Sequence, residues 1–226
     1  MSSSRNVLSV FLVIAAVMFA AGCASYRIGT NLEPAKGMAK LPPEVRFQIA
    51  SVTFVAPTNV PAGGSPDFGV YQPDAEAIRE MLVTAGRKHY PWVFSDLPHA
   101  IPIEVTITRK GYESTAGADA CASCLTLTII PLRSSDKTDY EVSVTSIAQP
   151  VEGLMTVEFS REEANWMSIL PLGWIPVPGG KGERAWGTDS ALKKTGEIMS
   201  RSCVDAIVKI IRRVEPEVWQ AGYPVK

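Results

Sequence analysis

Hydrophobic and polar residues alternate through the middle of the chain with a period of two, which is typical of antiparallel strands that bury one face. The clearest case is 101–109, where isoleucine or valine occupies every second position from Ile101 to Ile107 and Glu104, Thr106 and Thr108 are on the other face. The same alternation predicts three more strands, at 125–130, 140–145 and 155–160. The polar stretches 133–139 and 149–153 are predicted to connect them.

An earlier strand is predicted at 45–54, and its pattern changes parity once. Hydrophobic residues occupy Val45, Phe47 and Ile49, and then Val52 and Phe54. A one-residue change of parity turns the side chains to the other face, so it predicts a β-bulge near residues 50 and 51.

Two amphipathic helices are predicted from spacings of three and four residues. The first begins after Asp74, has a stripe at Ile78, Met81, Leu82 and Ala85, and stops at Gly86 and Pro91. The second runs from about Asp189 to Val214, with an apolar stripe at Met199, Cys203, Ala206, Ile207, Ile210 and Val214. Charges of alternating sign descend its other side at Lys193, Glu197, Arg201, Asp205, Lys209 and Arg213, which predicts a solvated face.

These elements follow one another in the order β-α-β-β-β-β-α. A helix with one apolar stripe and a sheet with one apolar face can bury these apolar surfaces against each other. We therefore predict an α+β fold, a mostly antiparallel sheet of about five strands with two amphipathic helices on one face.

The N-terminus predicts export. Val7 to Ala21 is an uncharged, largely apolar stretch, shorter than the roughly 20 residues of a transmembrane helix, and it ends in small residues as secretory signals do. The sequence Ala20-Ala21-Gly22-Cys23 resembles the lipobox of bacterial lipoproteins. That resemblance implies that 1–22 is a signal peptide and that Cys23 is lipidated and becomes the first residue of the mature chain. Ala24, where Asp would favour the inner membrane, implies the periplasmic side of the outer membrane.

The remaining chain divides into two parts. Residues 23–43, with three prolines and two glycines, are interpreted as the lipidated cysteine and a flexible tether. Residues 44–226 are predicted to form a single periplasmic α+β domain. The element order over 44–215 resembles the small domains of envelope lipoproteins such as LpoB and the N-terminal parts of TolB and CsgG. No motif accompanies that resemblance, so no functional residue is transferred.

Composition and motifs argue against several functions. Without Arg5 and the rest of the signal peptide, 21 basic residues face 23 acidic ones, so no electrostatic footprint for nucleic acid is present. Ser95, Asp96 and His99 occur together, but no Gly-x-Ser-x-Gly motif exists. We predict no catalytic residues, no cofactor and no metal, and the chain is not expected to be an enzyme.

Cys121 and Cys124 are spaced as Cys-x-x-C ahead of a predicted strand. Redox chemistry of this motif uses a helix N-terminus, and zinc needs about four ligands. In an oxidising envelope such thiols form disulfides, so we predict a disulfide involving one or both. A bridge between the two cysteines and a bridge from either to Cys203 stay open as alternatives, as do free structural thiols.

The apolar segment 165–180 carries no charge over 16 residues and holds three prolines. One interpretation is a connection folded over the end of the core. The other is a contact surface for a partner protein or the membrane interface, where tryptophan is favoured. Its candidate contact residues are Trp166, Leu170, Leu172, Trp174 and Ile175.

Together these observations predict a lipid-anchored accessory of the cell envelope. It would attach to the membrane through its anchor and bind another envelope protein without catalysing a reaction. The alternative is an oligomeric structural or secretion-associated outer-membrane component, in which copies of the chain associate.

Overall fold

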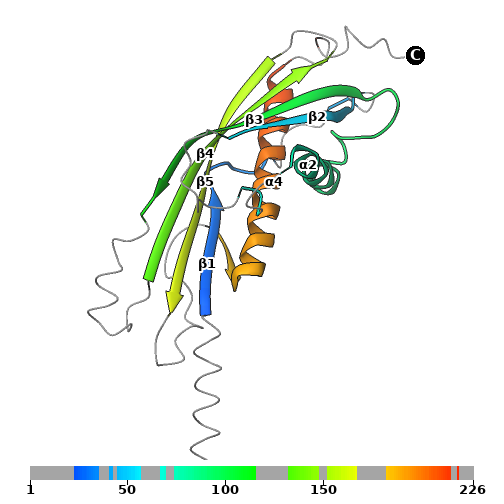
Figure 1. Cartoon of the computed structure of the whole chain (residues 1–226). Coiled ribbons are helices and arrows are strands. Elements are labelled where there is room, and N and C mark those ends of the chain that lie inside the picture. Colours follow the sequence, from blue (N-terminus) through cyan, green and yellow to red (C-terminus); the bar gives the residue numbers. More distant parts are fainter. Residues whose placement is uncertain are drawn as a thin grey trace, which may run out of the picture.

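The computed structural model describes residues 23–35, 41–42, 45–56, 67–69, 74–115, 132–147, 152–166, 182–214 and 218. Six strands form one curled sheet in the spatial order β2-β3-β4-β5-β1-β6, and two helices complete the fold (Figure 1). The elements are β1 (Cys23–Thr30), β2 (Phe47–Val55), α2 (Ala75–His89), β3 (Ile101–Ser114), β4 (Leu132–Ser146), β5 (Glu152–Trp166), β6 (Glu183–Trp186) and α4 (Thr188–Arg213). The predicted α+β class, with a mostly antiparallel sheet and two helices, is confirmed.

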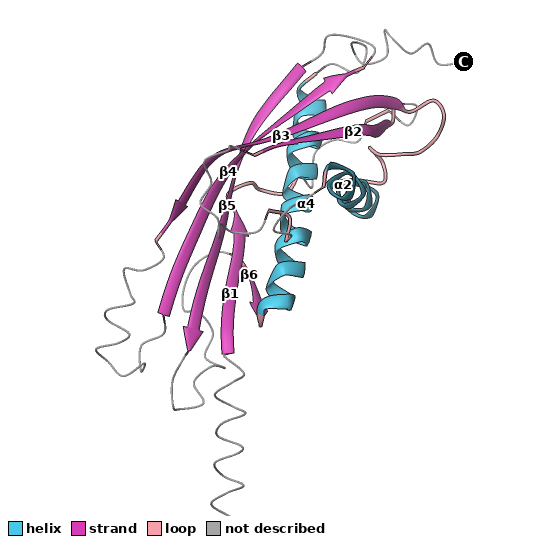
Figure 2. Ribbon diagram, in the orientation of Figure 1, coloured by secondary structure: helices cyan, strands magenta, loops and turns pink. Residues whose placement is uncertain are grey.

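Both helices lie on the same side of the sheet (Figure 2). The long helix α4 crosses β4, β5, β1 and β6, and α2 packs on β2 and on α4. The core lies between these layers, where Ile103, Ile107, Val142 and Ile207 are fully buried. Burying one such side chain stabilises the fold by about 1.5–3 kcal/mol.

The β-bulge predicted near residues 50 and 51 is confirmed. β2 pairs with β3 in parallel, and the register shifts between Ile49 and Ser51. At this point β2 has one residue more than β3. For this reason Ile49 and Val52, although three positions apart, both point into the core and are buried.

The helix α2 begins where predicted and ends two residues before Pro91, one of the two residues predicted to stop it. Gly86 does not stop it, and the helix continues to His89. A Cβ atom at Gly86 would lie 2.9 Å from Cδ2 of Phe94, so the glycine permits a close approach of that ring. Its role is packing rather than termination.

Residues 133–139 are not a connection. They belong to β4, which pairs with β3 on one side and with β5 on the other. The prediction was wrong because polar residues such as Asp136 and Thr138 lie on the inner face here, which hides the alternation. The strand predicted at 125–130 lies outside the described residues, and β5 already begins at Glu152, within the predicted connection 149–153.

The interpretation of 23–43 as a flexible tether is also wrong for its first part. Residues 23–30 form β1, which lies inside the sheet between β5 and β6. The following residues pack on α4. The amide of Ala35 donates to Asp205 Oδ1 at 3.1 Å, and Lys209 Nζ donates to the carbonyl of Glu33 at 2.7 Å.

The helix α4 has almost its predicted bounds, but its charged side is not wholly solvated. Asp205 is only 3% exposed. Its carboxylate accepts hydrogen bonds from the Tyr90 hydroxyl and the Ala35 amide. The alternating charges predicted a solvated face for α4 taken alone. They could not indicate that other segments of the chain pack onto this face at Asp205.

Candidate functional site

The end of the sheet at Cys23 is where four elements meet. Cys23, the first residue of β1, is opposite Trp166, the last residue of β5. On the other side of β1, Ser25 is opposite Trp186, the last residue of β6. The amide of Gly187 donates to the carbonyl of Ala24 at 3.0 Å, and α4 begins at the next residue.

Tyr26 ties these elements together. Its hydroxyl donates to Glu163 Oε1 at 3.2 Å and lies 3.3 Å from Thr188 Oγ1, at the start of α4. The guanidinium of Arg161 lies 4.9 Å from the centroid of its ring. Burial raises the pKa of the Tyr26 phenol, and the charge of Glu163 adds to that shift. The hydroxyl therefore stays protonated and keeps its hydrogen bond at neutral pH.

The short strand β6 exposes one apolar and one basic side chain here. Trp186 is 45% exposed, and Arg184, two residues earlier on the same face of the strand, is also exposed. On the opposite face, Ala185 is buried and Glu183 pairs with Lys194 and Arg201, at 2.7 and 2.9 Å. The exposed face of β6 is thus a tryptophan and a cation, side by side.

Several predicted site residues cannot be placed in this geometry. The side chains of Cys23 and Trp166, although their backbones belong to β1 and β5, lie outside the described residues. So do Leu170, Leu172, Trp174 and Ile175 of the apolar segment, and the Cys121/Cys124 pair. The sequence analysis did not select Trp186 or Arg184, because a four-residue strand has too few positions to show a pattern.

Cys203 is a buried free thiol on α4. Burial raises its pKa to about 12, and the charge of Asp205 contributes to the shift. Because the thiolate is the nucleophile of cysteine chemistry, this thiol is unreactive at neutral pH.

The residues Ser95 and Asp96 each contact a residue outside the trio of Ser95, Asp96 and His99. Ser95 Oγ accepts a hydrogen bond from the Leu97 amide at 3.2 Å, and Asp96 pairs with Arg87. His99 is exposed. Within the described part of the chain, no group of three or more His, Cys, Asp and Glu residues is arranged to hold a metal ion. In that same part, no helix has the length and apolarity needed to cross a membrane.

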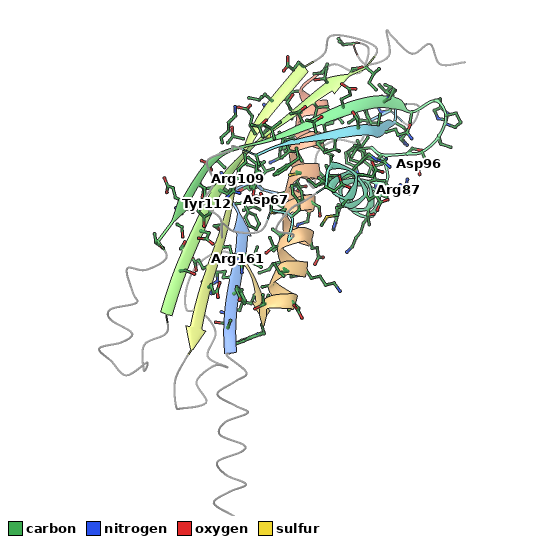
Figure 3. All side chains as sticks on the ribbon, viewed as in Figure 1. Asp67, Arg87, Asp96, Arg109, Tyr112 and Arg161 are labelled. Carbon is green, nitrogen blue, oxygen red and sulfur yellow. The ribbon has the colours of Figure 1, made fainter. Side chains whose placement is uncertain are left out.

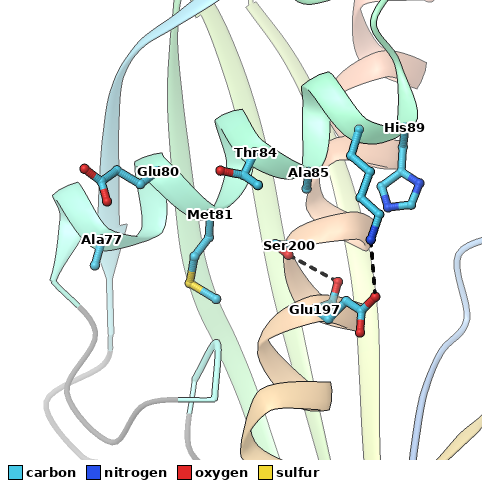
Figure 4. A pocket seen from close by; sticks show the side chains of 9 residues that line it. Ala77, Glu80, Met81, Thr84, Ala85, His89, Glu197 and Ser200 are labelled. Atoms are coloured by element: carbon cyan, nitrogen blue, oxygen red, sulfur yellow. Dashed lines mark hydrogen bonds and ion pairs between the residues drawn. The ribbon is translucent and has the colours of Figure 1, made fainter.

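Two of the hollows on the described surface lie against α4. An open groove of about 450 Å³ lies along the contact between α2 and α4, where Lys88 Nζ is 3.8 Å from Glu197 Oε1 (Figure 4). A smaller hollow of about 170 Å³ lies beside β1 and includes Arg201 and Asp205. The larger groove is lined by His89, Glu197 and Ser200 among others, and Ser200 Oγ donates to the carbonyl of Gly196 at 2.7 Å.

A buried ion pair lies on the inner face of the sheet (Figure 3). Arg109 Nη1 is 3.2 Å from Asp67 Oδ2, and the Tyr140 hydroxyl donates to Asp67. Burial raises the pKa of the Asp67 carboxyl, against the opposing effects of Tyr140 and Arg109. The only sequence signal of this cluster was Arg109 itself, a charged residue at a core-facing position of an alternating strand.

No protein-family model matches the chain, and no curated protein sequence matches it. Among solved structures, it is similar to the PelC dodecamer from Paraburkholderia phytofirmans and to a point variant of that dodecamer. Each superposition has a TM-score of 0.27 and 8% sequence identity, and covers 78% of this chain and 96% of the PelC chain. A TM-score of 0.27 is a loose superposition, and it assigns neither a family nor a function to this chain.

Proposed function

We propose that the chain is a lipoprotein of the cell envelope, anchored through Cys23, that acts as a non-enzymatic binding or assembly accessory on the periplasmic side of the outer membrane. The observation that supports this proposal is that the predicted cleavage site and the start of β1 fall at the same residue. The lipobox cysteine is also the first residue of β1. Cleavage before Cys23 removes residues 1–22 and leaves every residue of the strand in place.

The chemistry of the anchor fits that boundary. Each buried acyl CH₂ contributes about 0.8 kcal/mol, and stable attachment needs more than one chain, which a lipobox cysteine receives in lipoproteins of this kind. The anchor therefore replaces the N-terminal apolar stretch as the membrane attachment, and the sheet starts at the residue that carries it.

The binding role is supported by the sheet face opposite the helices. Neither α2 nor α4 covers this face, which displays Thr106, Glu104 and Glu158 together with the exposed Leu154. A broad polar face with an apolar residue within it is typical of non-obligate protein interfaces. The partner on this face would be another component of the envelope.

Labelling with an alkyne analogue of palmitate tests the anchor directly. The wild-type chain is expected to take up label and to have the mass of residues 23–226 plus its acyl groups. Cys23→Ser is expected to take up no label and to keep residues 1–22. Cys203→Ala is the matched control and should label like wild type. Label on Cys23→Ser would refute the proposal.

A second candidate function, an oligomeric envelope component, is supported by the edge strand β2. It lies at the end of the sheet, and its nine residues include neither a charge nor a proline. Natural edge strands usually carry such residues because they block pairing with another chain. At this edge Phe47 already bonds to Val93 and Ser95.

Native mass spectrometry of the detergent-extracted protein tests this candidate. Thr53 is exposed on β2, and Thr53→Lys places a charge on the edge. If copies pair through β2, the wild type is expected to be multimeric and the variant to be smaller. Thr156→Lys, at an exposed position of the interior strand β5, is the control and should keep the wild-type mass. A monomeric wild type would exclude the candidate.

A further inference from the structure

We propose that Trp186 and Arg184 form a second membrane contact beside the lipid anchor, a surface that binds the headgroup layer of the bilayer and fixes the orientation of the domain. This inference rests on the proposed anchoring through Cys23. It goes beyond that anchoring because a lipid attached at a single residue does not by itself fix the orientation of the domain.

First, no flexible segment separates Cys23, the residue that carries the anchor, from the sheet. Cys23 is already paired with Trp166, and the carbonyl of Ala24 already accepts a hydrogen bond from Gly187. Moving the anchor away from the sheet would break this ladder. Consecutive Cα atoms are about 3.8 Å apart, so the end of the sheet stays within a few ångströms of the residue that carries the lipid.

The second step is the depth of Trp186. It is opposite Ser25, two residues from Cys23, which is about 7 Å along a strand. The headgroup region of one leaflet is about 5–8 Å thick. Trp186 therefore lies at the height of the headgroups if the domain stands on its anchor. Nearly half of its side chain is exposed, and the membrane interface is where tryptophan is favoured.

The third step is the charge next to it. Arg184 is exposed on the same face, and no carboxylate within the described residues pairs with it. Its neighbour Glu183 lies on the other face, where Lys194 and Arg201 neutralise its charge. A guanidinium binds phosphate with two parallel hydrogen bonds. Arg184 is opposite Arg27, about 14 Å from Cys23 along the strand, so its long side chain has to extend back toward the membrane to meet the phosphates beside Trp186.

The elements around Tyr26 are connected to one another, so a membrane contact at Trp186 would orient the whole domain. Tyr26 connects β1 to β5 through Glu163 and reaches the first residue of α4 at Thr188. Because β6 runs directly into α4 through Gly187, a contact at Trp186 also fixes the direction of the long helix. The sheet face that would bind a partner is then presented in one orientation rather than many.

Fluorescence quenching tests the inference on the lipidated protein, reconstituted in phosphatidylcholine vesicles with a quarter of phosphatidylglycerol. The difference in emission between wild type and Trp186→Phe reports Trp186 alone, and the difference for Trp92→Phe, at a partly buried position beside α2, is the control. We expect brominated lipids to quench the Trp186 signal at least twofold more than the Trp92 signal. We expect the aqueous quencher iodide to affect the Trp186 signal less with vesicles than in detergent.

Charge reversals complete the test. Arg184→Glu is expected to halve the lipid quenching of Trp186 or to reduce it further. Arg213→Glu is the matched control and should leave it unchanged, because Arg213 is exposed at the far end of α4, about 37 Å along the helix. Protein that keeps its acyl groups and its vesicle attachment, but whose Trp186 signal is quenched by iodide and not by bromine, would overturn this inference alone. Protein without acyl groups at Cys23 would overturn the proposed anchor instead.

Discussion

Asp67 and Asp205 are both buried carboxylates, and each holds a short irregular segment of the chain in place near α4. Asp67 belongs to the segment 67–69, which packs on α4 where the Phe68 amide donates to Met199 Sδ at 3.1 Å. Asp205 belongs to α4 itself and holds the segment after β1 through the Ala35 amide. The two carboxylates differ in their partners.

Asp67 faces the cation of Arg109, whereas Asp205 accepts hydrogen bonds from two neutral donors, Tyr90 and Ala35. A buried cation needs a negative charge, because removing its partner leaves an uncompensated charge away from water. A neutral donor needs only an acceptor. Two aspartates of similar burial are therefore expected to respond differently to the same substitution.

The largest effect is expected for Asp67→Asn. The amide keeps the shape of the side chain and removes its charge, which leaves Arg109 buried without a counter-ion. Breaking a buried pair in this way costs about 3–5 kcal/mol. Urea unfolding followed by circular dichroism measures the free energy of unfolding. Asp139→Asn, at an exposed position on β4, is the control and should change it by less than about 0.5 kcal/mol.

A smaller effect is expected at Asp205. The Asn side chain retains an acceptor for Tyr90 and Ala35, so Asp205→Asn should cost about 1 kcal/mol. Asp205→Ala leaves both donors unsatisfied and should cost about 2–3 kcal/mol. The same unfolding experiment checks both values. If Asp205→Asn costs as much as Asp67→Asn, the proposed distinction between charged and neutral partners is wrong.

Tyr90 and Tyr140, which donate to Asp205 and Asp67, provide a second test of the difference between the two carboxylates. Tyr90→Phe and Tyr140→Phe each remove one hydroxyl donor to a buried carboxylate, and each should cost about 1–2 kcal/mol. Asp67 retains Arg109 after the change at Tyr140, whereas Asp205 retains only the Ala35 amide after the change at Tyr90. We therefore expect Tyr90→Phe to be the more destabilising of the two in thermal unfolding. The reverse order would show that Arg109 contributes little to holding Asp67.

The smallest effect concerns Cys203, two residues before Asp205. With its pKa raised to about 12, only about one thiol in ten thousand is ionised at pH 8. Iodoacetamide should leave Cys203 unmodified in the folded protein and modify it in urea, as peptide mass mapping will show. Above pH 9 the unfolded chain loses a thiol proton that the folded chain retains, so this group lowers stability as the pH rises toward 12. Rapid modification of Cys203 at pH 8 in the folded protein would contradict its burial.

Side-chain periodicity was sufficient for β3, where one face is buried, and for the bulge in β2. It also located nearly the full length of α4, although every residue from Ser202 to Val208 is buried. It failed for β1 because Ser25 and Arg27 are buried as well as Tyr26 and Ile28, so both faces are enclosed and no alternation remains. It failed for the start of β4 for the opposite reason, since polar residues line its inner face.

Of the candidate site, the sequence selected Cys23 through its resemblance to a lipobox, since a local motif needs no tertiary information. Its lipidation stays a prediction. Trp186 and Arg184 could not be found in the same way, because their meaning depends on the pairing of β6 with β1. Asp205 was assigned to a solvated face for a similar reason. Its partners Tyr90 and Ala35 lie more than a hundred residues away in the sequence.

The position of β1 also determines when the sheet can close. Its partners are Phe159 to Trp166 on one side and Glu183 to Trp186 on the other, all more than a hundred residues further along the chain. Contacts of such long sequence separation form slowly. While the chain is made, or moved across a membrane N-terminus first, β1 stays without its neighbours until nearly the whole polypeptide has followed. In the exported lipoprotein proposed above, late completion of the sheet would keep the precursor in the unfolded form that export requires.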